Sequence, residues 1–400
     1  MRQIITHFTD DDLYKLSMCC AVIDNYPRAM VKYMFVDRNN TVYPEGFADE
    51  LNRQVEALES VSVTQEEIDF MKRKCYYIPN WFYPYLKGFK FSKEWVKAWQ
   101  DEEGHLHLQI EGYWANTILL EVKLLAIISE LFYIMTGQTD KLDYDKCYEK
   151  AYNKAERLLG AGCVYSDFGT RRRASLQAED VVVRAMKECQ LSKKWEGTFV
   201  GTSNVYLAMK YDLTPVGTMA HEWIMCVGQG NHKHNPAYSN WYALDAWVKE
   251  YGVLNGIALT DTITTDCFLR DFQLTYSTLF SGVRHDSGDP IAWGEKMIEH
   301  YESIGIDPTT KTLLFSDSLD FKRADEIHSH FQGRAKVAFG IGTYLANDTK
   351  VNALNIVMKT TFCNGQDVAK ISDVEGKGMC KNDDYVDYLK RCINWRIDHE

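Results

Sequence analysis

The sequence predicts an α/β fold: an irregular, TIM-like α/β barrel and a second α/β domain that is discontinuous along the chain. Three observations support this. Between Cys163 and Thr343, short β-type apolar runs are each followed by a burst of Gly, Ser, Thr, Asp, Arg or His. The clearest units repeat at roughly 25 residues, as the crossovers of a parallel sheet require. Near residue 364 the pattern changes to an antiparallel hairpin.

Seven polar bursts mark the predicted barrel, because parallel α/β barrels place their chemistry at the C-terminal ends of their strands. The seven stretches are CVYSDFGTRRR (163–173), TFVGTSN (198–204), PVGTMAHE (215–222), IALTDT (257–262), GVRHDSGD (282–289), TLLFSDSLD (312–320) and KVAFGIGT (336–343). Each burst stands where such a strand end is expected. We therefore expect these side chains to share one rim.

The first 160 residues mix helices and strands. Thr9 or Asp10 is expected to cap a helix that runs to about Ile23. The other elements follow from apolar periodicity and from glycines at their ends. They are the strands Lys32–Val36 and His105–Ile110, a buried amphipathic helix over 117–136, and a helix over Tyr144–Leu159 that Gly160 ends.

The later barrel units are the clearest. Asp289 is expected to cap a helix whose first residue is Pro290, and Gly305 to end it. A second helix near Phe321–Phe331 should end at Gly333. The strands expected around these helices are Ile257–Leu259, Gly282–Arg284, Thr312–Phe315 and Lys336–Phe339.

A hairpin is expected in the tail, where Ile356–Thr361 and Val368–Ser372 flank Asn364-Gly365, a type I′ turn pair. An antiparallel hairpin does not extend a parallel barrel, so we expect it to return to the N-terminal sheet. The predicted domains are residues 1–135 together with about 355–400, and a barrel over residues 136–354.

Composition narrows the class of protein. The 400 residues are 46% hydrophobic, which suffices for a large core, and the net charge of −11 argues against a general nucleic-acid or anionic-membrane binder. Eleven cysteines without a CxxC pair fit reduced thiols.

The most apolar segment, 117–135, carries Glu121, Lys123 and Glu130 and is expected in a core, not in a membrane. The acidic start is not a signal peptide. We expect a cytoplasmic protein.

Three arginines follow the first predicted barrel strand, directly after Phe168-Gly169-Thr170. Arg171, Arg172 and Arg173 are not buried together without anions, and a guanidinium matches a carboxylate or a phosphate. Phe168 offers a ring for stacking. A solvated basic face is the alternative.

Other bursts allow both a binding role and a plain structural one. Gly201–Asn204 and Gly342-Thr343 could bring backbone N–H groups to a phosphate, or could be ordinary turns. Arg284 could hold an anion, and Asp286 a Mg²⁺ ion or ribose hydroxyls. Asp289 we expect to be a helix cap, and Asp320 in Ser316–Asp320 could also be one.

Histidines have the same ambiguity. His221, beside Glu222, could be a general base or a nucleophile that carries phosphate, although a lone histidine is more often structural. His232 and His234 lack an evident third ligand, so we expect a polar loop there. Near the start, Tyr14 and Lys15 offer a ring and an ammonium group, and in isolation would belong to a surface helix.

Taken together, the motifs are specific. They are, in order, DLYKLSM, DFGTRRR, GTSNVYLA, GTMAHEW, ALTDT, RHDSGDP, FSDSLD and FGIGTYL. In order and separation the chain closely resembles the nicotinate phosphoribosyltransferase family, from Phe8 to about Asp373. The resemblance implies the type II phosphoribosyltransferase fold, an irregular α/β barrel with an α/β sandwich domain. It also implies a homodimer with active sites at the interface.

The resemblance further implies the reaction. Nicotinate and 5-phosphoribosyl 1-pyrophosphate (PRPP) would give nicotinate mononucleotide and pyrophosphate in NAD salvage, as in an ATP-dependent ligase. ATP hydrolysis would be coupled through a phosphohistidine, with Mg²⁺ required.

Residue roles carry over by motif. His221 would accept phosphate from ATP. Phe168 would stack on the pyridine ring, with Tyr14 on the other face from this or the partner subunit, and Arg171 would face the nicotinate carboxylate or a nearby phosphate. The remaining residues would surround the other groups: Thr202 and Ser203 at the substrate, Arg284 and Asp286 at the ribose and pyrophosphate, Lys15 at a phosphate across the interface, and Ser318, Gly342 and Thr343 at the 5′-phosphate.

Ser203 bears on the choice of substrate, because relatives that use nicotinamide carry Asp there. An Asp about 4 Å from the nicotinate carboxylate would cost up to roughly 4 kcal/mol at an effective dielectric constant of about 20. A serine hydroxyl can donate to that carboxylate instead, which favours the acid.

Three other functions are compatible with parts of the sequence. Ser203 and the arginine run argue against a nicotinamide phosphoribosyltransferase, and a quinolinate enzyme would need more basic residues. A non-catalytic pyridine-nucleotide sensor should have lost one of the key residues His221, Arg284, Asp286 and Lys15. The roles of Asp261, Thr262, Asp317 and the loop 231–235 stay open.

Overall fold

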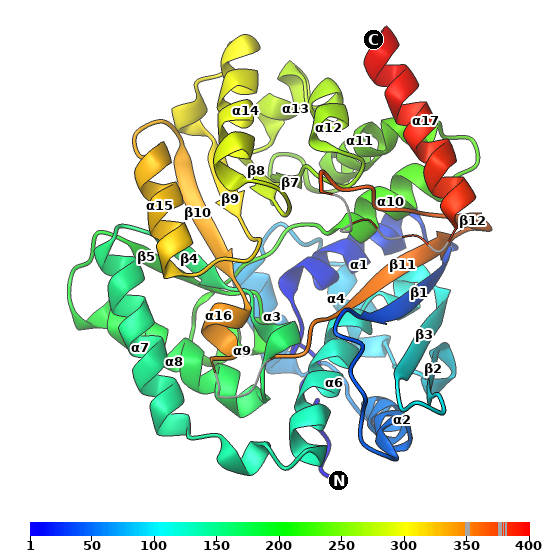
Figure 1. The fold of residues 1–400 in the computed structure, drawn as a ribbon, viewed down its shortest axis with the longest axis vertical. Coiled ribbons are helices and arrows are strands. Elements are labelled where there is room, and N and C mark those ends of the chain that lie inside the picture. The colour runs from blue at the N-terminus through cyan, green and yellow to red at the C-terminus, as the bar shows by residue number, and fades with distance from the viewer. Residues whose placement is uncertain (349–352, 375–377, 379, 381) are drawn as a thin grey trace.

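The computed structural model describes residues 1–348, 353–374, 378, 380 and 382–400. Two sheets organise these residues (Figure 1). One has seven parallel strands in the order β6-β5-β4-β10-β9-β8-β7, and the other five antiparallel strands in the order β12-β11-β1-β3-β2. The predicted fold class, an α/β barrel with a second α/β unit, is confirmed.

The parallel sheet curls into an open barrel. Its strands are β4 Val164–Asp167, β5 Thr198–Thr202, β6 Thr214–Pro215, β7 Ile257–Leu259, β8 Gly282–His285, β9 Thr312–Phe315 and β10 Lys336–Ile341. Every neighbouring pair is parallel, so all C-terminal ends meet at one rim. β6 and β7 are the two edges. The hydroxyl of Thr218, just after β6, donates to the carbonyl of Ile257 at 2.9 Å and bridges the opening.

Amphipathic helices lie beside these strands, among them α7 and α8 next to β4 and β5, and α14 and α15 next to β9 and β10 (Figure 1). Their bounds are α7 Tyr144–Gly160, α8 Leu176–Ser192, α14 Pro290–Ser303 and α15 Phe321–Phe331. Asp289 caps α14 by accepting the N–H of Ala292 at 2.9 Å, as predicted. Asp320 caps α15 through the N–H of Arg323 at 2.8 Å. These two aspartates are therefore structural.

The antiparallel sheet joins the two ends of the chain. Its strands are β1 Met30–Asp37, β2 Val96–Gln100, β3 Leu106–Tyr113, β11 Ile356–Cys363 and β12 Gln366–Asp367. β11 pairs along β1, with Met34 opposite Lys359 (Figure 1). Asn364 and Gly365 have φ angles of 51° and 88°, as a type I′ turn requires. The hairpin thus returns to the N-terminal sheet, as predicted, while the domain boundaries stay a prediction.

The second strand of the hairpin is Gln366–Asp367 and not the predicted Val368–Ser372. The N–H of Val368 still donates to the carbonyl of Thr361 at 3.1 Å, and the chain leaves β11 after it. The N–H of Ala369 donates to the side chain of Gln229 at 2.7 Å, and that of Ile371 to the carbonyl of Thr262 at 2.8 Å. These bonds hold the segment against the barrel rim.

The first helix begins later than predicted: Asp12, and not Thr9 or Asp10, is at the N-cap position, and its side chain makes no capping hydrogen bond. Distant partners take those two side chains: Thr9 donates to Glu67 at 2.6 Å, and Asp10 binds Arg173. The helices not yet named are α1 Leu13–Asn25, α2 Phe47–Leu58, α3 Gln65–Lys74, α4 Phe82–Gly88, α5 Trp114–Thr117, α6 Glu121–Met135, α9 Val205–Lys210, α10 His221–Gln229, α11 Ser239–Tyr251, α12 Thr265–Asp271, α13 Leu274–Leu279, α16 Thr343–Ala346 and α17 Asp383–His399. In the described part of the chain, none of the helices has both the length and the apolar character that crossing a membrane demands.

A buried ion pair ties the N-terminal segment to the barrel. The guanidinium of Arg173 binds both carboxylate oxygens of Asp10, at 2.6 and 2.7 Å, and contacts Glu179 at 3.2 Å. All three side chains are fully buried. The third arginine of the run is therefore structural, contrary to a shared role in binding substrate anions.

We expect Asp10→Ala to lower the free energy of unfolding by about 3–5 kcal/mol, because the buried Arg173 loses its bidentate partner and keeps only the longer contact with Glu179. Denaturant unfolding measures this change. Glu326→Ala is the matched control: its pair with Arg323 is largely exposed, so the loss should stay below about 1 kcal/mol. Equal losses in the two variants would contradict a special role for the Asp10–Arg173 pair.

Candidate active site

A cavity of about 590 Å³ lies at the C-terminal rim of the parallel sheet and reaches β11 of the other sheet. It collects most of the residues that the sequence predicts for the site. Those on its wall are Tyr14, Phe168, Arg171, Ser203, His221, Arg284, Asp286, Ser318, Gly342 and Thr343. Thr202 and Lys15 are not on its wall.

Two aromatic rings stand at one end of the cavity. Phe168 follows β4, and its N–H donates to the carbonyl of Ile341 at 2.9 Å. Gly340 makes room for this ring, because a Cβ there would lie 2.2 Å from it. Tyr14, on α1 of the same chain, lines the same cavity. Both rings thus line one cavity, and their role as a stacking pair for a planar ligand stays a prediction.

The guanidinium of Arg171 lies in the same cavity and makes no hydrogen bond to any described residue. The closest carboxylates to Arg171 are those of Asp12, 3.8 Å from Nε, and Glu121, 3.9 Å from one terminal nitrogen. The side chain remains 39% exposed. Two carboxylates therefore orient Arg171 and leave its planar fork available to an anionic ligand.

Ser203 and Arg171 both contact Asp12, a connection that the sequence did not reveal. Ser203 is nearly buried, and its hydroxyl donates to Asp12 at 2.7 Å. To donate to a substrate carboxylate, the hydroxyl must turn away from Asp12. Arg172, the second arginine of the run, also lines the cavity and donates to the carbonyl of Leu354 at 2.6 Å.

His221 is the first residue of α10, and its Nε2 lies 2.8 Å from Asp261 and 3.6 Å from Asp286. Burial, and after it the charge of Lys370, lowers the pKa of His221 to about 4, although Asp261 opposes the shift. The ring is therefore neutral near pH 7. Because the Asp261 carboxylate accepts, Nε2 carries the hydrogen and Nδ1 the lone pair.

Asp261, whose role the sequence left open, organises this part of the site. Besides His221, it binds the hydroxyl of Ser287 at 2.6 Å and the ammonium of Lys370 at 2.8 Å. Burial would raise its pKa, but His221 and Lys370 hold the pKa of Asp261 well below its usual value. Although His221, Asp261 and Asp286 are close enough to share a metal ion, Lys370 already supplies the positive charge.

Oxygen and guanidinium groups at the ends of β8, β9 and β10 line the cavity as well. Arg284 at the end of β8 donates to the carbonyl of Met219 at 3.1 Å, and Asp286 accepts from Ser316 at 3.1 Å. Ser318 has a φ of 51° and donates to Asp317 at 3.0 Å. Gly342 and Thr343 begin the short helix α16. This arrangement suits a phosphorylated ligand.

Two lysines of this cavity were missed from the sequence. Lys359 comes from β11 and Lys370 from the segment after β12. Burial, and after it the charge of Lys370, lowers the pKa of Lys359 to about 8. The predicted return of the hairpin was the signal that could have placed them, since it brings the C-terminal segment to the N-terminal sheet.

Lys15 and Thr202 lie beneath the cavity wall. Lys15 is fully buried instead of lying on a surface helix, and its ammonium binds Glu121 at 2.5 Å and also Glu222. Its predicted contact with a phosphate across a subunit interface stays a prediction. Thr202 is also buried and donates to Asp167 at 2.8 Å, and its predicted place at the substrate likewise stays a prediction.

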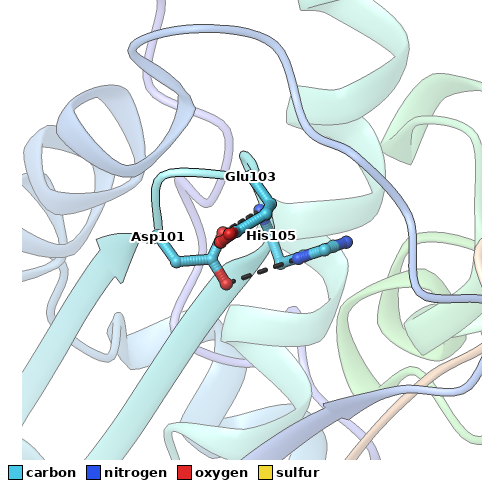
Figure 2. A group of neighbouring side chains, drawn as sticks. All are labelled: Asp101, Glu103 and His105. Atoms are coloured by element: carbon cyan, nitrogen blue, oxygen red, sulfur yellow. Dashed lines mark hydrogen bonds and ion pairs between the residues drawn. The ribbon is translucent and has the colours of Figure 1, made fainter.

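Two histidine groups lie elsewhere. In the loop 231–235, the His234 ring stacks on Tyr242 at 3.6 Å and lies 3.1 Å from Asn231. Figure 2 shows Asp101, Glu103 and His105 in the turn between β2 and β3. Asp101 accepts the N–H of His105 at 2.7 Å and lies 2.8 Å from His107 Nε2, so its oxygens stabilise the turn.

Comparison with known proteins gives a consistent result. The profile of the nicotinate phosphoribosyltransferase (NAPRTase) family matches residues 163–396, and that of its N-terminal domain residues 9–129. Nicotinate phosphoribosyltransferase 2 of Pseudomonas aeruginosa is 43% identical over 394 residues, which cover 97% of this chain and 96% of that protein.

Solved structures are similar over the same length. The crystal structure of nicotinate phosphoribosyltransferase from Porphyromonas gingivalis has a TM-score of 0.91 at 37% identity, covering 97% of this chain and 100% of that one. A putative nicotinate phosphoribosyltransferase from Saccharomyces cerevisiae has a TM-score of 0.93 at 32% identity, covering 99% of each chain.

We expect the His221 ring to stay neutral until the pH approaches about 4, as its lowered pKa requires. Its ring resonances in an NMR titration measure this directly. The unfolded ring titrates near pH 6.5, so the unfolded chain binds more protons between these values. The stabilising contribution of His221 is thus complete above pH 6.5 and is lost as the pH falls toward 4. The variant His221→Asn should lack this loss of stability between pH 6.5 and 4. A titration midpoint of His221 near pH 6.5 in the folded protein would contradict the neutral, buried ring.

Proposed function

Since the chain belongs to the nicotinate phosphoribosyltransferase family, we propose that it forms nicotinate mononucleotide and pyrophosphate from nicotinate and PRPP, coupled to ATP through phosphorylation of His221. The enzyme class and its place in NAD salvage follow from the family. One observation carries the finer proposal: a single cavity holds two aromatic rings, a guanidinium available to an anion, and a neutral histidine.

Nicotinate binding uses the aromatic end of the cavity. The pyridine ring lies between Phe168 and Tyr14, and Arg171 receives the carboxylate in a bidentate contact. The ring nitrogen attacks C1 of the ribose with its own lone pair, so no general base is needed. Stacking and the carboxylate contact therefore contribute mainly by holding the nitrogen in line with the bond that breaks.

PRPP occupies the opposite end. Arg284 and Asp286 hold the ribose and pyrophosphate, and the backbone at Gly342 and Thr343, with Ser318, surrounds the 5′-phosphate. As the bond from C1 to the pyrophosphate breaks, negative charge grows on the leaving group. The cations near it are Arg284, Lys359 and Lys370, which stabilise that charge.

Mg²⁺ fits the acidic side of this end. Asp286 and Asp317, at the ends of β8 and β9, both line the cavity and offer the carboxylate oxygens that the ion prefers. We expect one or both to hold a Mg²⁺ ion that arrives on the pyrophosphate. When bound, the ion neutralises charge on the leaving group.

Phosphorylation of His221 uses the nitrogen that Asp261 leaves free. Nδ1 attacks the γ-phosphorus of ATP, the bond from that phosphorus to the bridging oxygen breaks, and ADP leaves with the electron pair. The hydrogen bond from Nε2 to Asp261, at 2.8 Å, stabilises the positive charge that the ring gains. Water later takes the phosphoryl group from the ring, which restores the neutral histidine and releases phosphate.

The alternatives fit the site less well. Nicotinamide has no negative charge for Arg171, and a sensor that only binds pyridine nucleotides has no need for a neutral histidine fixed by a buried aspartate. A homodimer and a cytoplasmic location remain part of the proposal and rest on the family resemblance. Within one chain, Phe168 and Tyr14 both line the cavity, which supports a stacking role for the two rings.

Product formation from PRPP and Mg²⁺ tests the proposal, comparing nicotinate with nicotinamide, each with and without ATP. We expect nicotinate mononucleotide, formed faster with ATP. The variant His221→Asn should lose ATP hydrolysis but keep a slow, ATP-independent transfer. Full ATP stimulation of that variant would refute the role of His221. Turnover of nicotinamide alone would place the chain with the amide-using enzymes, and no turnover of either would favour the sensor.

We expect Ser203→Asp to reduce kcat/KM for nicotinate at least about tenfold, since the new carboxylate faces both Asp12 and the substrate carboxylate. Steady-state kinetics measure this. Ser203→Asn is the matched control, because it has the same shape without the charge and should lose much less. Unchanged nicotinate kinetics in Ser203→Asp would remove Ser203 from the specificity argument.

A further inference from the structure

Lys15 is a buried cation shared between two carboxylates on different helices. From α1, its ammonium binds Glu121, the first residue of α6, and Glu222, the second residue of α10. Its side chain is fully buried, and both carboxylates line the cavity. Glu222 directly follows His221 in the sequence. One charge thus connects the helix that begins with His221 to another wall of the site.

The two carboxylates are held differently. Glu222 has both oxygens occupied: one binds Lys15, and the other accepts from the hydroxyl of Tyr33 and the indole of Trp114, each at 2.5 Å. Glu222 therefore moves together with α10 and the core around it. Glu121 binds Lys15 through one oxygen only, while its other oxygen lies 3.9 Å from Arg171. That contact is loose enough to change.

We propose that Lys15 is a positioning residue that transmits the phosphorylation state of His221 to Arg171. The proposal rests on the proposed function, in which ATP phosphorylates His221 and Arg171 receives the nicotinate carboxylate. A phosphoryl group adds negative charge at the start of α10, beside Asp261 and Asp286. Any resulting shift of the first turn of α10 displaces Glu222.

The displacement then reaches Arg171 in two steps. Lys15 has one ammonium for two carboxylates, so a change in its distance to Glu222 changes its attraction for Glu121. Glu121 in turn competes with the substrate carboxylate for Arg171. Lys15 also lies 5.6 Å from the centre of the Tyr14 ring, the expected stacking partner of the pyridine. The two residues expected to contact nicotinate are therefore both close to Lys15: Tyr14 directly, and Arg171 through Glu121.

A second buried ion pair in the same core provides a control, because it stabilises the fold without connecting α10 to Arg171. Lys123 on α6 binds Asp11 at 2.5 Å, and both side chains are fully buried, as Lys15 is. Neither Lys123 nor Asp11 is among the described residues that line the cavity. Removing either lysine leaves a buried carboxylate without its cation, but only Lys15 connects the histidine helix to Arg171.

The experiment compares Lys15→Met with the matched control Lys123→Met. It measures the KM for nicotinate and kcat with and without ATP, and the amount of phosphohistidine formed from γ-labelled ATP. We expect the nicotinate KM to change about fivefold or more on adding ATP in the wild type and, even where its absolute activity is lower, in Lys123→Met. Lys15→Met should still be phosphorylated on His221, yet its nicotinate KM should be nearly the same with and without ATP.

Each other outcome has a defined meaning. An ATP-dependent nicotinate KM in Lys15→Met, equal to that of the wild type, would overturn the role of Lys15. If Lys15→Met and Lys123→Met lost the ATP-dependent change of the nicotinate KM equally, Lys15 would have only a structural role. A wild type that forms no phosphohistidine would overturn the ATP coupling itself, and the role of Lys15 with it. If Lys15→Met does not fold, Glu121→Gln decides: it keeps an oxygen for Lys15, removes the charge facing Arg171, and should also lose the ATP-dependent change.

Discussion

Three consecutive aspartates fix the N-terminal segment to three different parts of the molecule, and the site depends on that attachment. Asp10 binds Arg173 after β4, Asp11 binds Lys123 on α6, and Asp12 accepts from Ser203 after β5. All three are essentially buried. A buried carboxylate is tolerated only with its partners in place, so the segment has one low-energy position. That position brings Tyr14 to the cavity and Lys15 beneath it.

The cavity is consequently shared between the two sheets. The strand ends of the barrel supply Phe168, Arg171, Arg284 and Asp286, while β11 supplies Lys359. The barrel alone would offer the aromatic end and part of the phosphate end, but fewer cations for a pyrophosphate. The discontinuous second sheet therefore has a chemical role, because it places positive charge opposite the carboxylates of the barrel rim.

Local patterns predicted much of this, and long-range pairing accounts for what they missed. The strands of the barrel, the caps of α14 and α15, and the Asn364-Gly365 turn all follow from neighbouring residues. Thr9 and Asp10 looked like helix caps, but the partner of Asp10 is 163 positions away. The run of three arginines divides for the same reason: Arg171 faces the cavity, Arg172 binds a main-chain carbonyl there, and Arg173 is neutralised in the core. Glu121 and Lys370 carry no local pattern at all, since only the folded chain brings Glu121 to Lys15 and Lys370 to the Asp261 that binds His221.

The pairing of β11 with β1 has a consequence for biosynthesis. β1 ends at Asp37 and β11 begins at Ile356, so about 320 residues are translated before the two strands can meet. At typical rates of synthesis this takes roughly 20 to 60 s, during which one edge of β1 has no strand to pair with. An unpaired edge invites association with other chains, and chaperones commonly protect such nascent segments. Because Lys359 and Lys370 also follow most of the cavity lining in the sequence, a ribosome that stalls before Lys359 leaves a chain that lacks both lysines of the site.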